Sequence, residues 1–426
     1  MSKKVCFLIY YQKKNFFSFN ALVAALETQK DLEDIKIYFV RGRENLFDTI
    51  KSILPKFDFI ILGISFFTSQ LWEIKSLIQK LNKKYPRKII KVAGGPHATG
   101  ESLNTLKMGF DLVVVGEGEE TIIDIIRNAK SGEKLTNAKG IAYIGDEKQY
   151  VFTGKRKLID LDDYPPLPIK HVKFGSIEIT RGCPYVCYFC QTPYIFGTTP
   201  RHRSIDSICR AVEFMATRYN KKDIRFISPN AFSYGSVDGK TLNLLKLDEL
   251  VCSVKKIIAP DGRLFLGSFP SEVRPEHVIK DTLELVKNYA SNDNIVIGAQ
   301  SGSQRVLDLC NRGHTVEDIF RAVQLTLEFN LKANVDFIFG FPFQEEYDIN
   351  LTIDAIKELA KMGARIHTHS FLPLPQTAFK SLKAKKITKK VRKTLHELNV
   401  RGLAFGDWKK QEDLAFRITK FMNKEK

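Results

Sequence analysis

The chain carries one compact cysteine motif, in the stretch Arg181-Gly182-Cys183-Pro184-Tyr185-Val186-Cys187-Tyr188-Phe189-Cys190. Three cysteines follow the spacing CxxxCxxC, inside a loop rich in glycine, proline and aromatic residues. The other four of the seven cysteines stand alone, at Cys6, Cys209, Cys252 and Cys310. Isolated cysteines are usually small buried hydrophobic residues, whereas a tight cluster without a disulfide pattern favours metal binding or catalysis. The motif is therefore the strongest functional signal in the sequence.

Three assignments of this motif have to be compared. Thiolates are soft ligands that suit zinc or an iron–sulfur cluster. A structural zinc site normally has four protein ligands, and His202 is the only nearby candidate for the fourth. Three thiolates on a [4Fe-4S] cube would instead leave one iron open to a ligand from outside the protein. Three unbonded thiols are the least favoured alternative.

Around the motif, apolar runs typical of strands alternate with helix-length amphipathic segments such as Ile205–Arg218, Asp248–Ile258 and Tyr347–Met362. The predicted strands are Ser176–Thr180, Asp223–Ser228, Arg263–Ser268, Asn294–Ala299, Lys332–Phe339 and Arg365–Phe371. Six βα units are fewer than the eight that close a full barrel. The sequence therefore predicts a partial (β/α)6 barrel with the cysteines after its first strand.

The N-terminal part shows the same alternation. Its predicted strands are Val5–Tyr10, Ile35–Val40, Phe57–Ile64, Lys88–Ala93 and Asp111–Val115, with a helical pattern at Ser69–Lys84 among the segments between them. Strands that alternate with helices imply a doubly wound parallel sheet, an α/β fold. In such a sheet ligands bind beyond the carboxyl ends of the strands.

Three glycine-containing loops follow those strand ends, at Gly63–Ser69, Gly94–Thr99 and Gly116–Glu119. Glycine lets the backbone approach a bulky ligand closely, because it has no Cβ. In any single loop the glycines could serve only to make a tight turn. Three such loops on one edge favour a ligand-binding edge.

The boundary between the two parts is predicted at a proline-rich connector, Asp160–Pro168, because proline fixes φ and removes a backbone donor. A β-hairpin appendage, Gly140–Ile144 with Tyr150–Phe152, precedes it. We therefore expect a first domain over residues 1–152, a linker over 153–172, the partial barrel over 173–379 and a basic helical extension over 380–426.

Composition places the chain among globular proteins. Hydrophobic residues make up 44% and charged residues 27% of its 426 residues, which excludes a disordered, collagen-like or disulfide-stapled chain. The longest apolar stretch, Phe57–Phe67, is much shorter than the ~20 residues of a membrane span. Val5–Tyr11 follows Lys3 and Lys4 without a cleavage site, as expected for a first strand rather than a signal peptide. We expect a soluble, cytoplasmic protein.

The net charge is +18. Much of it comes from Lys380–Lys426, which holds 15 lysines and arginines against 5 acidic residues. Such a tail can attract phosphate-rich partners, including nucleic acid. A proteome that is generally rich in lysine explains the same charge, so charge alone does not identify a partner.

The cysteine motif, with an aromatic residue before its last cysteine, resembles the radical S-adenosylmethionine (SAM) superfamily. Gly298–Ser303 is similar to the G-x-E/Q-S-G-S segment of the branch that includes methylthiotransferases, and His369–Thr377 is similar to its closing strand. Asp336–Pro342 resembles the GFPGE segment of that branch, from which the chain departs at Phe343 and Gln344.

The N-terminal part resembles the cobalamin-binding domain that precedes many radical SAM enzymes. The similar segments are Gly94–Ala98 and Asp111–Glu119. The Asp-x-His-x-x-Gly motif that supplies a lower axial histidine in other cobalamin proteins is absent. His97 therefore either lies near the corrin without binding cobalt, or caps the following helix.

These resemblances imply the cofactors and the residues that bind them. Cys183, Cys187 and Cys190 would hold a [4Fe-4S] cluster whose open iron binds SAM. Contacts with SAM would come from Phe189 near the adenine, Ser228 at the methionine end, and Gln300 and Ser301 at the ribose or carboxylate. Contacts with cobalamin would come from Ser65, Thr68, Gly94, Gly95, His97, Gly116, Glu117 and Glu119. Ordinary loop packing and turn chemistry are the alternative for these side chains.

The resemblance implies a methylase. A radical derived from SAM would remove a hydrogen from an unreactive carbon, methylcobalamin would supply the methyl group, and a second SAM would remethylate the cobalt. The expected partners are a one-electron reductant such as ferredoxin or flavodoxin, and a small-molecule or lipid-like substrate.

Three alternatives stay open. A methylthiotransferase acting on tRNA or protein would carry a second cluster on three N-terminal cysteines, but residues 1–170 contain only Cys6. The others are a radical SAM and cobalamin enzyme that does not methylate, and a non-catalytic cobalamin sensor. No feature of the sequence identifies the substrate.

Overall fold

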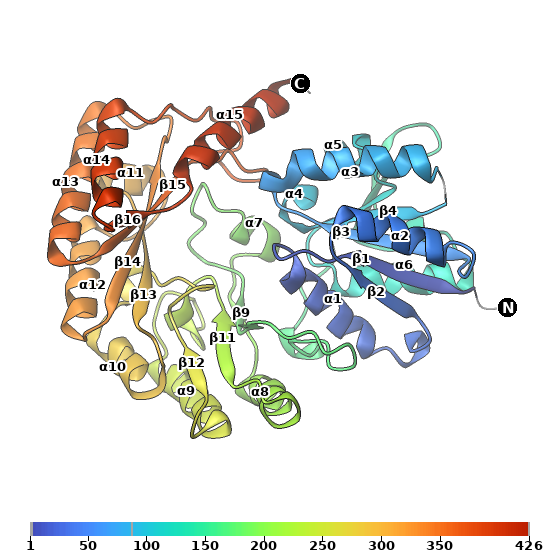
Figure 1. Ribbon diagram of the computed structural model, residues 1–426, viewed down its shortest axis with the longest axis horizontal. Coiled ribbons are helices and arrows are strands. Elements are labelled where there is room, and N and C mark those ends of the chain that lie inside the picture. Colours follow the sequence, from blue (N-terminus) through green and yellow to red (C-terminus); the bar gives the residue numbers. More distant parts are fainter. Residues whose placement is uncertain (1–2, 87, 425–426) are drawn as a thin grey trace. The chain divides into compact units, whose positions relative to one another are not determined.

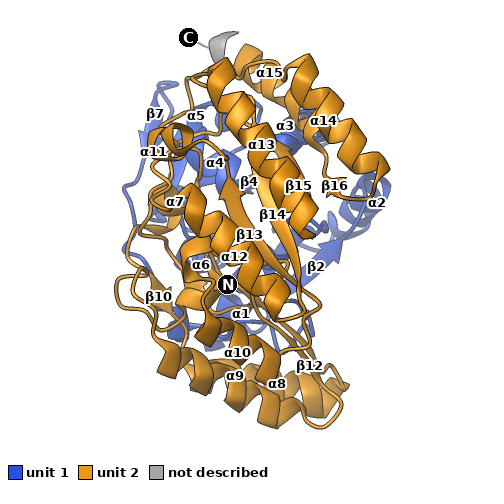
Figure 2. Cartoon of the chain, turned by 90° about the vertical axis from the view of Figure 1, so that its left-hand side faces the viewer, with its two compact units in different colours: residues 1–175 blue, residues 176–426 orange. Residues whose placement is uncertain are grey.

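The computed structural model describes residues 3–86 and 88–424 (Figure 1). The chain divides into two compact units, residues 1–175 and 176–426 (Figure 2). Within the described ranges, no helix is both long enough and apolar enough to cross a membrane.

The first unit is built on one seven-stranded sheet with the order β2-β1-β3-β4-β5-β6-β7. The strands are β1 Val5–Tyr10, β2 Lys36–Val40, β3 Phe59–Ser65, β4 Ile90–Gly94, β5 Leu112–Val114, β6 Ile141–Ile144 and β7 Tyr150–Phe152. The first five are parallel, in the order of a doubly wound fold whose strand order reverses between β1 and β3. The predicted α/β class is confirmed, and each predicted strand is found within two residues of its expected bounds.

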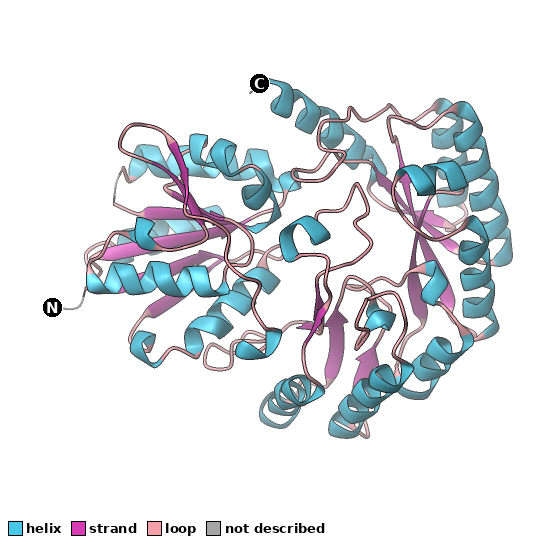
Figure 3. Cartoon of the chain, turned by 180° about the vertical axis from the view of Figure 1, so that it is seen from behind, coloured by secondary structure: helices cyan, strands magenta, loops and turns pink. Residues whose placement is uncertain are grey.

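Helices cover both faces of this sheet (Figure 3). They are α1 Phe16–Glu27, α2 Arg43–Ile53, α3 Leu71–Lys84, α4 Gly95–Gly100, α5 Ser102–Lys107 and α6 Glu119–Ser131. Helix α3 shows why they form: its five buried residues recur at helical spacing and its lysines face solvent. All six residues of β1 are buried, as expected for a strand covered on both faces.

The predicted hairpin extends the sheet and is not an appendage. Strand β6 pairs antiparallel with β5, and β7 pairs with β6. Burial explains this position, because Ile141 and Ala142 are completely buried beside β5. The connector that follows is tied to the same unit: the Glu27 carboxylate accepts hydrogen bonds from the backbone N–H groups of Ile169, Lys170 and His171.

The second unit contains two main sheets, with the orders β12-β11-β8 and β13-β14-β15-β16. Their strands are β8 Ile177–Glu178, β11 Asp223–Ile227, β12 Arg263–Phe265, β13 Asn294–Gln300, β14 Lys332–Phe339, β15 Arg365–Ser370 and β16 Ala404–Phe405. All pairs in these two sheets are parallel. A backbone bridge between Val273 and Ile297 connects the two sheets. Strands β9 Thr180–Arg181 and β10 Arg201–His202 form a separate antiparallel pair.

The helices of this unit are α7 Thr192–Phe196, α8 Ile205–Tyr219, α9 Leu244–Ile258, α10 Lys280–Tyr289, α11 Gln304–Leu309, α12 Val316–Glu328, α13 Glu346–Met362, α14 Lys389–Val400 and α15 Trp408–Lys424. Helices α10, α12 and α13 lie on one side of β13, β14 and β15 (Figure 1). The C-terminal extension is not wholly helical as predicted, because β16 adds a strand beside β15. Burial of Ala404 at this edge accounts for the extra strand.

Candidate functional site

The cysteine loop begins at the end of the short strand β9. Gly182 has a φ of +92°, and a Cβ there would lie 2.4 Å from the Thr199 carbonyl oxygen, so only glycine fits. The N–H of Cys183 donates to Gly197 O at 3.1 Å, and the N–H of Cys190 donates to Cys187 O at 2.9 Å. The backbone therefore fixes the loop without help from a bound group.

Of the three cysteines of the motif, Cys187 is buried, and Cys183 and Cys190 are half-buried. Burial raises the pKa of Cys183, and it raises the pKa of Cys190 to about 11. The neighbouring thiols add to both shifts, so the three groups lie in one electrostatic environment. A metal ion would overcome this cost of deprotonating the thiols, because it binds the thiolate and displaces the proton.

His202, the predicted fourth ligand of a zinc site, is already engaged. Its Nδ1 lies 2.9 Å from Thr180 Oγ1 and its Nε2 lies 2.8 Å from the Ser236 carbonyl oxygen. Neither ring nitrogen is left for a metal. Three thiolates without a fourth protein ligand fit a [4Fe-4S] cube with one open iron.

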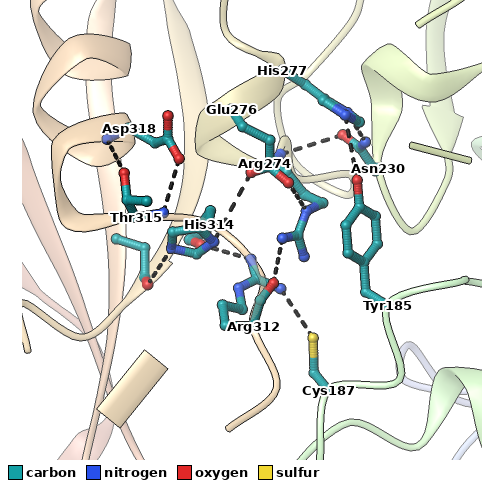
Figure 4. Close-up of polar contacts among 12 residues, drawn as sticks. Tyr185, Cys187, Asn230, Arg274, Glu276, His277, Arg312, His314, Thr315 and Asp318 are labelled. Carbon is teal, nitrogen blue, oxygen red and sulfur yellow. Dashed lines mark hydrogen bonds and ion pairs between the residues drawn. The ribbon is translucent and has the colours of Figure 1, made fainter. Parts of the chain in front are cut away.

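A buried cation accompanies the motif. Arg312 donates through Nη1 to Cys187 Sγ at 3.5 Å (Figure 4). It also donates through Nη2 to Gly298 O at 2.6 Å. Burial lowers the pKa of the Arg312 guanidinium, but Cys187 and the two acids Glu272 and Glu276 outweigh this effect and leave the pKa above its ordinary value. Arg312 therefore supplies positive charge where a cluster would bring negative charge.

A second layer holds the loop between the cysteines. The Arg274 guanidinium lies over the Tyr185 ring at 3.4 Å from its centre, and it also donates to the Arg312 carbonyl oxygen. The Tyr185 hydroxyl contacts His277 Nε2 at 3.3 Å, and the other nitrogen of His277 contacts Asn230 (Figure 4). This network ties the loop to the segment that follows β11.

The four predicted SAM contacts differ in their surroundings. Ser228 Oγ donates to Asn230 O at 2.8 Å, and Ser301 Oγ is shared with Thr352 and the Ser303 N–H, so both hydroxyls already hold turns. Gln300 has a φ of +73°, a left-handed conformation that is rare outside glycine. Such outliers concentrate at functional sites, so Gln300 is the strongest polar candidate of the four.

Phe189 lies in an aromatic cluster. It packs against Phe341 at a ring distance of 6.0 Å, and Phe343, Phe371 and Phe379 complete the cluster. The two positions where the chain departs from the family segment have structural roles here. Phe343 stacks on Phe341, and Gln344 Oε1 accepts from the backbone N–H groups of Gly340 and Phe341.

The ligand-binding edge predicted in the first unit has open backbone at two glycines. A Cβ on Gly94 or Gly116 would meet nothing within 4 Å, whereas a Cβ on Gly95 would lie 2.6 Å from Ser65 Oγ. Gly94 and Gly116 therefore present bare backbone to a ligand. Gly95 instead serves close packing against Ser65.

His97 is completely buried in α4 and caps no helix. Its Nδ1 contacts Thr68 Oγ1 at 3.1 Å, and burial lowers its pKa to about 4. Among the described residues, its Nε2 and Gln12 Nε2 are buried without a hydrogen-bond partner. Open glycines and unpaired buried nitrogens on one sheet edge fit a large ligand that brings its own polar groups.

The two acidic residues predicted at this edge serve the fold. Glu117 Oε2 accepts from the Ile159 N–H at 2.9 Å, and Glu119 lies buried in the first turn of α6. Asn15, which the sequence did not single out, joins the loops after β1 and β3 by donating to Tyr10 O and Ser65 O. Asn15 therefore shapes the point where the strand order reverses.

A further polar group lies on β14 and β15. Asp336 pairs in register with His367, and His369 follows two residues later. Sequence reasoning missed these residues, although the alternation in Arg365-Ile-His-Thr-His-Ser370 indicates one polar face. Arg312 was also missed, because it lies 125 residues from Cys187.

Two families match the chain: the Radical SAM superfamily over residues 177–356 and the B12 binding domain over residues 18–126. An uncharacterized methyltransferase of Pyrococcus horikoshii is 25% identical over 342 residues, covering 78% of this chain and 71% of the relative. A putative methylthiotransferase of Methanocaldococcus jannaschii is 29% identical over 316 residues, covering 72% and 66% of the two chains.

Two solved structures share the fold. The radical SAM methyltransferase TsrM from Kitasatospora setae, with cobalamin and a [4Fe-4S] cluster bound, has a TM-score of 0.67 at 16% identity, covering 90% of this chain and 78% of TsrM. The cobalamin-dependent radical SAM enzyme OxsB has a TM-score of 0.63 at 18% identity, covering 83% of this chain. The match spans about half of OxsB, 52% of its length.

Proposed function

We propose that this chain, a radical SAM enzyme with a B12-binding domain, transfers a methyl group to an unactivated carbon of its substrate. Its cofactors are a [4Fe-4S] cluster, SAM and cobalamin. The observation that carries the proposal is the presence, in one chain, of a three-cysteine motif whose nearby histidine, His202, is already hydrogen-bonded, and of a sheet edge with open glycines. The names of the relative from Pyrococcus horikoshii and of TsrM support methyl transfer.

When bound, the cluster and SAM supply one-electron chemistry and cobalamin supplies a methyl carrier. In this proposal, Cys183, Cys187 and Cys190 bind the cluster. Arg312 offsets its negative charge at Cys187. The aromatic cluster around Phe189 and Phe341 excludes water from that side of the loop.

We propose that Gln300 and Phe189 contact SAM directly. The left-handed backbone of Gln300 supports this role, and Phe189, inside the cysteine loop, is only half-buried while it packs on Phe341. Ser228 and Ser301 would act through the turns that their hydroxyls hold. At the first unit, Gly94 and Gly116 would meet cobalamin through their backbone, with Ser65, Thr68, Gly95 and His97 beneath.

The test is anaerobic reconstitution with iron, sulfide and hydroxocobalamin, followed by incubation with a one-electron reductant such as reduced flavodoxin and with SAM carrying a deuterated methyl group. Mass spectrometry should find 5′-deoxyadenosine and S-adenosylhomocysteine together. C187A should abolish 5′-deoxyadenosine. A reconstituted chain that forms neither product, or that takes up zinc in place of iron, would contradict the proposal.

Methylthiotransfer is the second candidate, because a tRNA-2-methylthio-N(6)-dimethylallyladenosine synthase of Petrotoga mobilis is 27% identical over 292 residues, 65% of this chain and 63% of that enzyme. The single cysteine of residues 1–175, Cys6, does not favour methylthiotransfer. Cys6 is completely buried in β1, and burial raises its pKa to about 12. A product that gains sulfur as well as the labelled methyl group would favour methylthiotransfer.

A further inference from the structure

The two central strands of the second unit's four-stranded sheet have faces of opposite character. Val335, Phe337 and Ile366 are completely buried, on the face covered by helices. The alternating positions form what we call the polar face: Asn334, Asp336, His367 and His369. Because neighbouring strands are parallel and in register, Asp336 lies beside His367, and Ile338 lies beside His369. Rigid strands, not loops, therefore position this group.

Three side chains of the polar face converge. His367 Nδ1 lies 2.8 Å from Asp336 Oδ1, and His369 Nε2 lies 3.2 Å from His367 Nδ1. All three atoms lie within 4.8 Å of one another. Metal–ligand bonds of about 2.0–2.2 Å place adjacent ligand atoms about 3 Å apart. The three atoms thus already have the spacing of ligands around one ion.

Hydrogen bonds around these atoms orient the ring of His369. The Ser370 N–H donates to Gln411 Oε1 at 2.8 Å, which orients the Gln411 amide so that its Nε2 faces His369 Nδ1 at 3.3 Å. The other ring nitrogen of His369, Nε2, faces His367 Nδ1.

His367 Nδ1 also faces the Asp336 carboxylate at 2.8 Å, so this one ring nitrogen contacts both of the other side chains.

A second carboxylate lies nearby. Glu272 reaches solvent-accessible space, and its carboxylate has no hydrogen bond or ion pair within the described part of the chain. Glu272 lies close enough to Asp336 for the charges of the two carboxylates to interact. One divalent cation near Asp336 would lower the repulsion between both acids.

The imidazole of His367 is held in place for such a role. Its ring stacks on Phe405 of β16 with a centroid distance of 4.5 Å and an interplanar angle of 10°. It also lies edge-on against His369. Because both rings are already fixed, binding an ion costs little conformational entropy.

We propose that Asp336, His367 and His369 bind one divalent transition-metal ion on the polar face of the second unit. Two imidazoles and one carboxylate are a ligand set typical of zinc and of non-haem ferrous iron. Three protein ligands leave positions for water or for an oxygen or nitrogen atom of a substrate. The site is distinct from the cysteine motif and does not depend on the proposed methyl transfer.

Gln411 gives the proposal a specific signature. When His369 Nε2 binds a metal ion, the ring proton is on Nδ1. There it faces Nε2 of the Gln411 amide, which is also a donor. A histidine ligand is normally supported by an acceptor at its other nitrogen, and such partners change metal affinity 10- to 100-fold. Q411E supplies that acceptor, so it should bind the ion at least 10-fold more tightly.

The test uses the full chain with C183A, C187A and C190A, which removes the competing thiolates. After treatment with EDTA the protein is titrated anaerobically with Co²⁺, whose visible absorption reports nitrogen and oxygen ligands, and bound metal is counted by mass spectrometry. One Co²⁺ per chain is expected, with displacement by Zn²⁺. H367Q, H369Q and D336N should each weaken binding at least 100-fold, and H396Q, an exposed histidine on α14, should not.

Two results would overturn the proposal: no saturable binding of Co²⁺ or Zn²⁺ in the parent protein, or binding that H367Q and H369Q leave unchanged. Because Q411E should tighten binding, its effect cannot be mistaken for misfolding. Unchanged or weaker binding in Q411E would likewise contradict the ligand assignment. The test needs neither the cluster nor cobalamin, so its outcome is separate from that of the methyl-transfer experiment.

Discussion

The guanidinium of Arg312 lies 3.5 Å from the sulfur of Cys187, and it is one of the buried cations around the cysteine loop. A cluster that gains an electron becomes more negative, so this charge stabilises the reduced form. At an effective dielectric constant of about 20 and a distance of about 6 Å, one charge contributes on the order of 100 mV.

R312Q should therefore lower the midpoint potential of the reconstituted cluster by on the order of 100 mV. A redox titration followed by electron paramagnetic resonance measures this shift. R312K keeps the charge but loses the two-pronged geometry, so its potential should lie between the two. Equal potentials for R312Q and the parent protein would mean that Arg312 only supports the fold through Gly298.

Cys187 and Cys310 form a matched pair of buried thiols: burial and the neighbouring Cys187 raise the pKa of Cys310, but only Cys187 belongs to the motif. C187A should lose the cluster, with iron and sulfide content falling to background. C310A should retain both, at a cost of about 1 kcal/mol of stability for the lost packing. Iron loss in C310A as well would indicate a fourth thiolate ligand and no open iron.

Gly94 and Gly95 are neighbours with opposite tolerance for a side chain. G95A places a Cβ against Ser65 Oγ and Phe66 N at a φ of +87°, and it should cost roughly 1–3 kcal/mol of unfolding free energy. G94A meets no atom and should leave the melting temperature unchanged, yet weaken hydroxocobalamin binding in equilibrium dialysis. If G94A binds hydroxocobalamin as the parent does, the corrin does not approach that backbone.

Burial of His97 makes the first unit sensitive to acid. Its pKa of about 4 lies below the value of about 6.5 in an unfolded chain. The unfolded state therefore binds the proton first, and stability falls as the pH drops from about 6.5 to about 4, by about 3 kcal/mol in total.

H97Q should remove most of this pH dependence. Trp72 of α3 reports the unfolding of the first unit when the second tryptophan is replaced by W408F in both proteins. Urea midpoints at pH 7 and pH 5 then give the comparison. An equal loss of stability in H97Q would assign the acid sensitivity to other groups.

Patterns local in sequence predicted most of the fold. The bounds of β14 were exact, because eight residues rich in apolar side chains run without a turn signal. Strand β12 was predicted three residues too long. Gly267, at a φ of +70°, turns the chain after Phe265, and Val273 takes over the bridge to β13.

The side-chain groups of the site were harder to predict from the sequence. The cysteine motif lies within eight residues, so its spacing is readable directly. Asp336 and His367 are 31 residues apart, and only the register of β14 and β15 brings them together. The same holds for Arg312, whose role depends on where two distant loops meet. Strand β16 was missed because two residues in a lysine-rich segment carry no detectable periodicity.

The short strand β16 has a consequence for anyone who shortens this protein. It covers the outer edge of β15, where the Ile366 N–H donates to Leu403 O at 2.8 Å. A chain cut near residue 379 would leave that edge bare, with unpaired backbone groups ready to join a second molecule. The lysine-rich C-terminal segment thus protects an edge strand of the sheet, and its removal should promote aggregation.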